Sequence, residues 1–167
     1  MIKESITYIK TSLQALEKLT MSLSDKESRN LMITDRWNLN NTIAHIVGWT
    51  EQLRKEIKFL LESKNESFPW FINAKNNWTA FNDQNVTKYQ SISLQELIEL
   101  YKHINEQIIE LVEKNKESSL LEIKHEIKYY GKFSPVTILE MIRMKFEHEQ
   151  VHLKQIKDKI KTLPNKK

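Results

Sequence analysis

Apolar residues recur every three or four positions along four long segments of this 167-residue chain, and this spacing constrains the fold more than any other feature. A period near 3.6 residues places apolar side chains on one face of a helix, which is then buried against other helices. The segments are residues 3–23, 41–63, 94–112 and 135–163. Four amphipathic helices of this length predict an all-α protein, a four-helix bundle.

Capping signals set the expected helix boundaries. Ser93 and Glu96 have the spacing of a capping box, which predicts the start of the third helix. Ser134 followed by Pro135 is typical of an N-cap and a first-turn proline, so we expect the last helix to start there. Asn40 or Asn41 is the expected N-cap of the second helix.

The connection between the second and third helices is the least regular part of the chain. Residues 64–92 are too many for an ordinary bundle connection, which has roughly 2–8 residues. We therefore expect a crossover that carries a short extra helix around residues 71–85. Polar side chains of that helix, such as Asn82 and Asn85, are expected to face a substrate.

Composition excludes several other classes of protein. With 2 Gly and 3 Pro, the chain has too few turn residues for a many-stranded β fold. No apolar run approaches the length of about 18 residues that suggests a membrane helix, and the N-terminus lacks the pattern of a secretory signal. The absence of Cys excludes disulfides, thiolate metal sites and a Cys nucleophile. We expect a cytoplasmic protein without a membrane partner, with one domain over residues 1–163 and a flexible basic tail over residues 164–167.

The charge pattern predicts no nucleic-acid partner. The chain carries 26 basic and 22 acidic residues, a net charge of +4, and its lysines gather only near the C-terminus. A nucleic-acid site is expected to have a basic stripe with interleaved aromatic residues, and the sequence has no such stripe.

His148 and His152 form the densest group of chemically active residues. They lie four positions apart on a predicted helix, so both imidazoles leave the same face and can reach one ion. The string from His148 to His152 also matches H-E-x-x-H, the zinc-protease motif. No His or Glu follows His152 as a third ligand, and Gln155 stands where a turning Gly is needed in some of these proteases. The sequence therefore argues against a zinc protease.

A third ligand for such an ion has to come from another segment. His45 lies beside Trp49 on the flank of the second helix, at the edge of the predicted core, as do His148 and His152. His103 is expected at the surface or its boundary, and His125 in solvent.

Glu149 falls on the apolar stripe of the last helix, where a carboxylate is partly buried and needs a partner. Two roles stay open from the residues alone. Glu149 is either a structural hydrogen-bond acceptor or a functional carboxylate that supports a metal site or acts in acid–base chemistry.

Three stretches together resemble the DinB/YfiT superfamily and, in chain order, extend over nearly the whole sequence. They are WNLNNTIAHIVGW (37–49), FNDQNVTKYQSISLQELIELY (81–101) and YGKFSPVTILEMIRMKFEHEQVHLKQI (130–156). The last stretch ends in the H-[ED]-x-x-H-L-x-Q pattern of DinB-like domains. The resemblance implies an up-down-down-up bundle with a divalent metal held by three histidines, which match His45, His148 and His152.

The resemblance also implies a class of function. We expect a metal-dependent enzyme, with Zn²⁺ or Ni²⁺ as the ion, a small-molecule substrate and Glu149 as a catalytic carboxylate near the ion. Because the chain has no Cys, a thiol nucleophile would arrive as a low-molecular-weight cosubstrate, giving an S-transferase, whereas activated water would give a hydrolase. The alternative is a non-catalytic stress-response bundle that binds or sequesters a ligand. A homodimer is compatible with either function.

Overall fold

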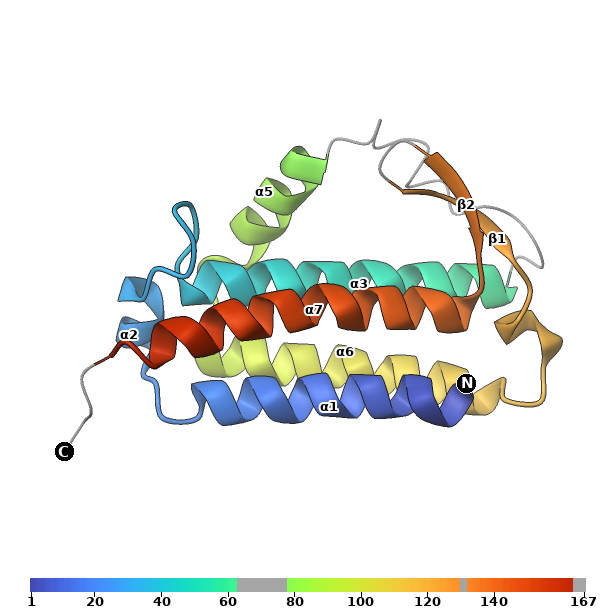
Figure 1. The fold of residues 1–167 in the computed structure, drawn as a ribbon, viewed down its shortest axis with the longest axis horizontal. Helices are drawn as coiled ribbons and strands as arrows, with labels where there is room; N and C mark the ends of the chain where they lie inside the picture. The colour runs from blue at the N-terminus through green and yellow to red at the C-terminus, as the bar shows by residue number, and fades with distance from the viewer. Residues whose placement is uncertain (63–77, 130–131, 164–167) are drawn as a thin grey trace.

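The computed structural model describes residues 1–62, 78–129 and 132–163, and its main body is a bundle of four long helices (Figure 1). These are α1 (Ile2–Thr20), α3 (Leu39–Glu62), α6 (Leu94–Lys114) and α7 (Ile138–Ile160). The closest pairings are α1 with α7 and α3 with α6, and α3 also packs against α7. The predicted all-α four-helix bundle is confirmed.

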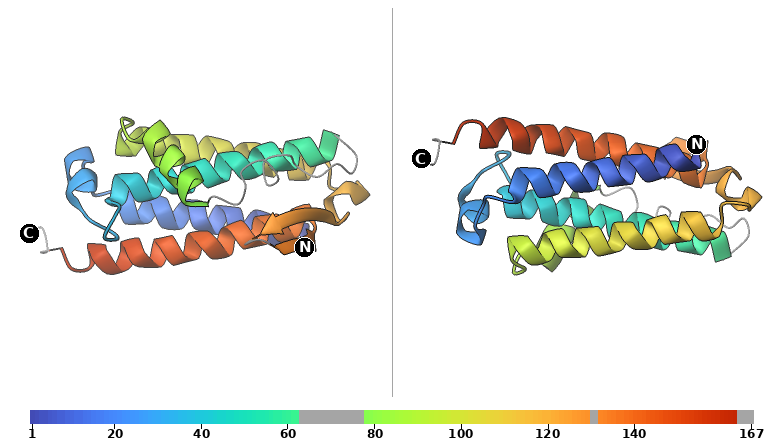
Figure 2. Two further views of the ribbon diagram at one scale, coloured as in Figure 1. Left: turned by 90° about the horizontal axis from the view of Figure 1, so that it is seen from above. Right: turned by 90° about the horizontal axis from the view of Figure 1, so that it is seen from below.

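The helix directions follow the up-down-down-up order that the family resemblance implied. In Figure 1, α1 and α7 run one way while α3 and α6 run the other way. Because α3 and α6 are parallel neighbours, the chain has to travel back along the bundle between them. The helix α5 (Trp78–Tyr89) belongs to this crossover and packs on α3 (Figures 1 and 2). The predicted extra helix is therefore present, while residues 71–77 of its expected range lie outside the described residues.

Three of the described helices begin with a capping box. In it the N-cap hydroxyl accepts a hydrogen bond from the backbone N–H of a glutamate three residues later, and that carboxylate accepts one from the N-cap backbone N–H. The box of Ser93 and Glu96 starts α6, as predicted. The box of Ser24 and Glu27 starts α2 (Asp25–Asn30), a short helix that precedes α3. At α3, the Asn38 side chain accepts a hydrogen bond from the Asn41 backbone, so the helix starts slightly earlier than expected.

The predicted start of the last helix at Pro135 is wrong. Thr137 caps α7 in a third capping box with Glu140, and Pro135 lies in a strand. Strand β1 (His125–Tyr129) pairs antiparallel with β2 (Lys132–Val136), with Pro135 opposite Glu126. A two-stranded ladder tolerates a proline because each strand has one unpaired edge. The one-turn helix η1 (Ser119–Leu121) connects α6 to this hairpin.

The core consists of the apolar faces of the four long helices, with Leu16, Ile43, Ile57, Leu97, Ile108 and Ile142 among its fully buried side chains. Among the described residues, the core also contains Glu56 of α3 and Lys145 and Glu149 of α7. No helix among the described residues has both the length and the hydropathy of a membrane-spanning segment. The predicted tail, residues 164–167, lies outside the described residues.

Gly48 allows α5 to approach α3 closely, next to the helical turn that carries His45. A Cβ atom added at Gly48 would lie 2.2 Å from Cγ of Asn85, a distance that real structures do not show. Asn85 itself is buried, with 7% of its surface exposed, so its side chain has little room to withdraw. The lack of a side chain at position 48 therefore sets how closely the crossover helix packs.

Replacing Gly48 with Ala tests this contact. In an ordinary helix, Gly→Ala stabilises by about 0.5–1 kcal/mol, whereas a clash with a packed neighbour costs about 1–3 kcal/mol. We expect Gly48→Ala to lower the free energy of unfolding measured in urea. Because Cβ of Asn85 would itself lie 2.6 Å from the added atom, Asn85→Gly is the change that removes the clash, and Gly48→Ala in that background should stabilise. If Gly48→Ala stabilises the wild-type protein as well, the close packing is refuted.

Candidate metal centre

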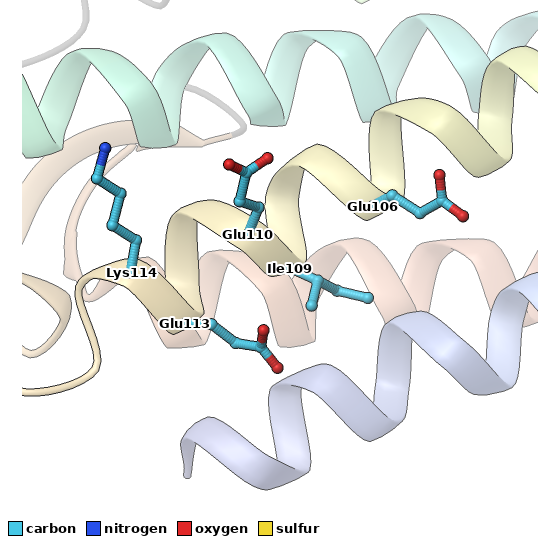
Figure 3. A pocket seen from close by; sticks show the side chains of 5 residues that line it. All are labelled: Glu106, Ile109, Glu110, Glu113 and Lys114. Carbon is cyan, nitrogen blue, oxygen red and sulfur yellow. The ribbon is translucent and has the colours of Figure 1, made fainter.

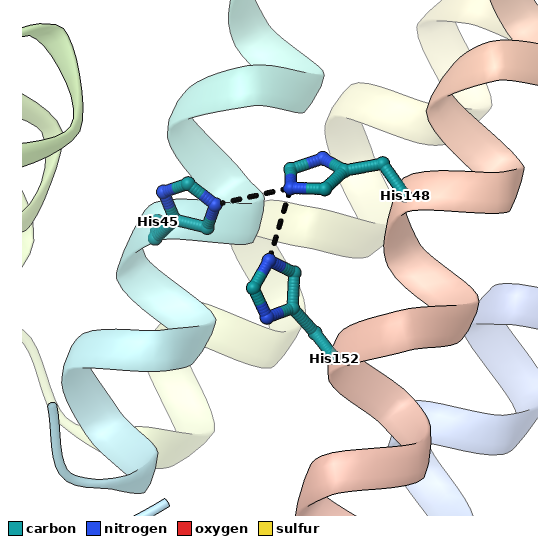
Figure 4. A group of neighbouring side chains, drawn as sticks. All are labelled: His45, His148 and His152. Carbon is teal, nitrogen blue, oxygen red and sulfur yellow. Dashed lines mark hydrogen bonds between the residues drawn. The ribbon is translucent and has the colours of Figure 1, made fainter. Parts of the chain in front are cut away.

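Three histidines from two antiparallel helices converge at the interface of α3 and α7 (Figure 4). Nε2 of His148 lies 3.0 Å from Nε2 of His152 and 3.4 Å from Nε2 of His45. One nitrogen from each ring lies within 4.8 Å of the others. His148 and His152 share a face of α7 because they are one helical turn apart. The packing of α3 on α7 adds His45, so the structure brings all three predicted ligands together.

Burial keeps these imidazoles neutral at physiological pH. Removal from water, with smaller contributions from the neighbouring His152 and His148, lowers the pKa of His45 to about 2. Burial, the proximity of His152 and the charge of Lys145 lower the pKa of His148 to about 4. Burial also lowers the pKa of His152, against opposing contributions from Gln155 and Glu149. Neutral imidazole is the form that binds metal ions.

A hydrogen bond orients one of the three rings. Nδ1 of His152 lies 3.1 Å from Oε1 of Gln155, an oxygen that can only accept. In the neutral ring the proton is therefore on Nδ1, and the lone pair of Nε2 faces the cluster. Hydrogen-bond partners of this kind fix the tautomer of metal-binding histidines. Sequence analysis noted Gln155 only as the residue in place of a glycine.

The donor set fits a small divalent cation. Since Nε2 of His152 carries a lone pair, its neighbour on His148 can donate its single proton to only one of the two flanking rings. At most one of the two short N···N contacts can therefore be a hydrogen bond, and a cation bound by all three nitrogens would satisfy the other. Two imidazole nitrogens on one tetrahedral zinc ion are about 3.3 Å apart, close to the two short separations here.

The other two histidine candidates do not join the cluster. His103 is exposed on α6 and lies 3.0 Å from the side chain of Gln107, as expected for a surface residue. His125, expected in solvent, is only 4% exposed, so that prediction is wrong. It lies at the start of β1, and a residue entering the hairpin is covered in a way that helical spacing does not reveal.

Glu149 faces the bundle core and is 3% exposed. Its Oε1 accepts hydrogen bonds from Lys145 at 2.7 Å and from Tyr101 at 2.9 Å, with Thr50 at 3.5 Å. Burial and the adjacent carboxylate raise the pKa of Tyr101 well above its usual value. The expected burial of Glu149 is confirmed, while its catalytic role stays a prediction. Sequence analysis missed Lys145, although its position four residues before a buried glutamate was a usable signal.

Aromatic side chains border the histidine cluster on the side of α3 and α5. The ring of Trp37 lies 4.7 Å from that of His45, and the ring of Trp49 lies 6.0 Å from that of His148. Asn82 accepts a hydrogen bond from the indole N–H of Trp49 at 2.9 Å, and its expected contact with a substrate stays a prediction. This bond and the packing of Asn85 on Gly48 fix α5 against the part of α3 that carries His45.

A surface groove of about 630 Å³ lies on another part of the bundle, along α6 (Figure 3). It is lined by Glu106, Ile109, Glu110, Glu113 and Lys114, all from one face of that helix. Most of these side chains are charged and none is a histidine. We therefore take the histidine cluster, and not this groove, as the candidate site.

The sequence model of the DinB superfamily matches residues 8–156 of the chain. No curated protein matched the sequence. Two crystal structures of the mycothiol-dependent maleylpyruvate isomerase, one of a histidine-to-alanine mutant, share the fold with TM-scores of 0.73 and 0.72 and identities of 11% and 10%. Each comparison covers 93% of this chain but 60% of the isomerase chain, so this chain spans about three fifths of that protein.

A third structure is that of the colibactin self-resistance protein ClbS in complex with a dsDNA, with a TM-score of 0.73 and 17% identity. The match covers 98% of this chain and 97% of that chain. This neighbour contradicts the prediction that excluded a nucleic-acid partner. A basic stripe along the sequence is not required, because a folded bundle can gather cations from separate helices.

The lowered histidine pKa values predict how the metal-free protein responds to acid. Unfolded histidines take up protons near pH 6.5, whereas folded His148 does so only near pH 4 and His45 near pH 2. The unfolded state therefore binds more protons below pH 6.5, and stability is lost as the pH falls from 6.5 towards 4. Each buried histidine contributes up to about 1.4 kcal/mol per pH unit.

The variant His148→Asn should reduce this slope in urea unfolding curves measured between pH 6.5 and 4. His103→Asn, at an exposed site, is the matched control and should leave the slope at its wild-type value. Equal slopes in His148→Asn and the wild type would contradict the burial of a neutral imidazole at position 148.

Proposed function

The chain belongs to the DinB superfamily, and we propose that it is a metal-dependent protein in which His45, His148 and His152 hold one divalent cation. The observation that carries this proposal is the convergence of three Nε2 atoms from rings that burial keeps neutral. Three imidazoles leave a coordination position for a ligand, as in catalytic zinc sites. Zn²⁺ and Ni²⁺ are the proposed ions, since both suit imidazole donors.

The proposed activity is transfer to or from a thiol cosubstrate, or hydrolysis, on a small-molecule substrate. When bound, such an ion would lower the pKa of a thiol or water and so supply a nucleophile near neutral pH. The chain has no Cys, so a thiol has to come from a cosubstrate. The structural neighbour described as mycothiol-dependent supports a thiol over water.

In this proposal the protein positions the reactants. Gln155 holds His152 in the tautomer that presents its Nε2 lone pair. Trp49, fixed by its hydrogen bond to Asn82, excludes water from the side of α5. Glu149 supports the site from the core and is itself bound to Lys145 and Tyr101.

Nucleic-acid binding is the second candidate function, of the non-catalytic class. It is favoured by the match to ClbS, described in complex with a dsDNA, over nearly the full length of both chains. Exposed lysines follow the histidine pair on the last turns of α7 and at its C-cap: Lys154, Lys157, Lys159 and Lys161. Lys154 is paired with Asp158, which leaves three lysines as candidate phosphate contacts.

Elemental analysis of tag-free protein tests the metal site. We expect about one zinc or nickel ion per wild-type chain and none in His148→Ala/His152→Ala, because the remaining imidazole alone cannot hold a catalytic-type ion. His103→Ala, at the exposed histidine, should retain the metal. Metal-loaded protein should then consume a low-molecular-weight thiol in the presence of an electrophilic substrate. A metal-free wild type after reconstitution would refute the site, and loaded protein inactive across thiol and ester panels would refute the enzyme.

Fluorescence anisotropy with a labelled duplex tests the second candidate. Binding through phosphate contacts should weaken about 10-fold or more between ~50 and ~200 mM salt. Lys157→Glu/Lys161→Glu should reduce both the affinity and the salt slope, whereas His148→Ala/His152→Ala should bind the duplex like the wild type. No binding at ~50 mM salt would eliminate this function.

A further inference from the structure

A buried ion pair lies on α7 behind the histidine cluster. Nζ of Lys145 is 2.7 Å from Oε1 of Glu149, and the two side chains are 6% and 3% exposed. Two groups on α6 complete the arrangement. Asn105 accepts a hydrogen bond from Lys145 at 3.0 Å, and the hydroxyl of Tyr101 donates to Glu149 at 2.9 Å.

Stability alone does not account for this pair. Removing two charges from water costs several kcal/mol for each ion, and replacing a buried pair with apolar residues of similar size is often neutral or stabilising. Beyond the polar groups that bind the pair, the core of the bundle is apolar. The pair is therefore better explained by what it does to its neighbours.

Two of the proposed metal ligands, His148 and His152, lie on the same helix as the pair. Lys145 precedes His148 by three residues and His152 by seven, so helical geometry places its ammonium group on the histidine side of α7. Glu149 directly follows His148 on the same helix, so both charges of the pair lie within one helical turn of a proposed ligand. Both charges thus reach the cluster through a poorly screening interior.

A lone ammonium group at this place would oppose the binding of a cation by the three imidazoles. The carboxylate of Glu149 neutralises this ammonium charge, and it does so through only one of its two oxygens. Oε1 accepts the bonds described above, while Oε2 is buried and has no hydrogen-bond partner among the described residues. Asn105 holds the ammonium group towards α6, so the positive charge is both neutralised and drawn away from the site.

We propose that Glu149 is a positioning residue that makes the site competent for a cation by neutralising Lys145 and holding it towards α6. The inference rests on the proposed metal site and adds a cause for its affinity. In this proposal Glu149 acts on Lys145 and touches neither the substrate nor the ion.

Metal affinity in a double-mutant cycle tests the proposal. The dissociation constant for Zn²⁺ is measured by competition with a chromophoric chelator, and the absorption spectrum of the Co²⁺-loaded protein reports the ligand set. Glu149→Gln, which keeps an acceptor for Tyr101 but leaves Lys145 uncompensated, should weaken Zn²⁺ binding about 10- to 100-fold. Lys145→Met/Glu149→Gln should return the affinity to within about threefold of the wild type, with an unchanged Co²⁺ spectrum.

The chain offers a matched control for the pair. Lys154 and Asp158 have the same spacing on the same helix and the same 2.7 Å separation, but their side chains are 78% and 51% exposed. Because water and salt screen an exposed pair, Asp158→Asn should leave Zn²⁺ affinity unchanged.

Two results would overturn the inference. If the double variant binds Zn²⁺ as weakly as Glu149→Gln, the carboxylate acts on the site directly and not through Lys145. If Glu149→Gln binds like the wild type, the pair has no effect on the site. If Glu149→Gln fails to fold, the Zn²⁺ affinity of Lys145→Met is the test. It should be at least that of the wild type, and weaker binding would overturn the inference. Loss of binding in the wild type itself would instead refute the proposed metal site.

Discussion

The packing of α3 against α7 is the constraint on which the candidate site depends, because it brings three uncharged imidazoles face to face. Two of the rings share a helical turn, but the third comes from a helix about one hundred residues earlier in the sequence, at 3.4 Å from His148. Burial in the bundle keeps the rings neutral and hence able to bind a metal ion. A capping box sets the start of α7, and the contact at Gly48 packs the crossover helix α5 on α3 next to His45.

Local spacing in the sequence was sufficient to predict the helices and two of the three converging histidines. The helical period of the apolar residues depends only on neighbours along the chain. The same is true of the capping boxes and of the one-turn separation of His148 and His152. His45 was singled out by its place on the flank of its helix and by the family resemblance. Pro135 misled the analysis because a proline suits both the first turn of a helix and an edge strand, and the capping box of Thr137 and Glu140 decides between them.

Several features that were not predicted from the sequence depend on distant partners. Lys145 is tolerated in the core only because Asn105 and Tyr101 of α6 surround it and Glu149, and no local pattern encodes those contacts. His125 is covered by the hairpin end of the bundle, which periodicity does not describe. The fold is shared with a mycothiol-dependent isomerase and with a protein whose structure is of a complex with dsDNA. Architecture therefore does not select the activity, and the side chains around the three rings must do so.

The most direct test of the account is the anomalous diffraction of crystals grown with zinc and measured on both sides of the zinc absorption edge. The account predicts one strong peak per chain between α3 and α7, at about 2.0–2.1 Å from a ring nitrogen of each of His45, His148 and His152. A peak elsewhere on the chain, or none at this interface in zinc-saturated crystals, would contradict it. The three histidines would then be structural residues of the bundle.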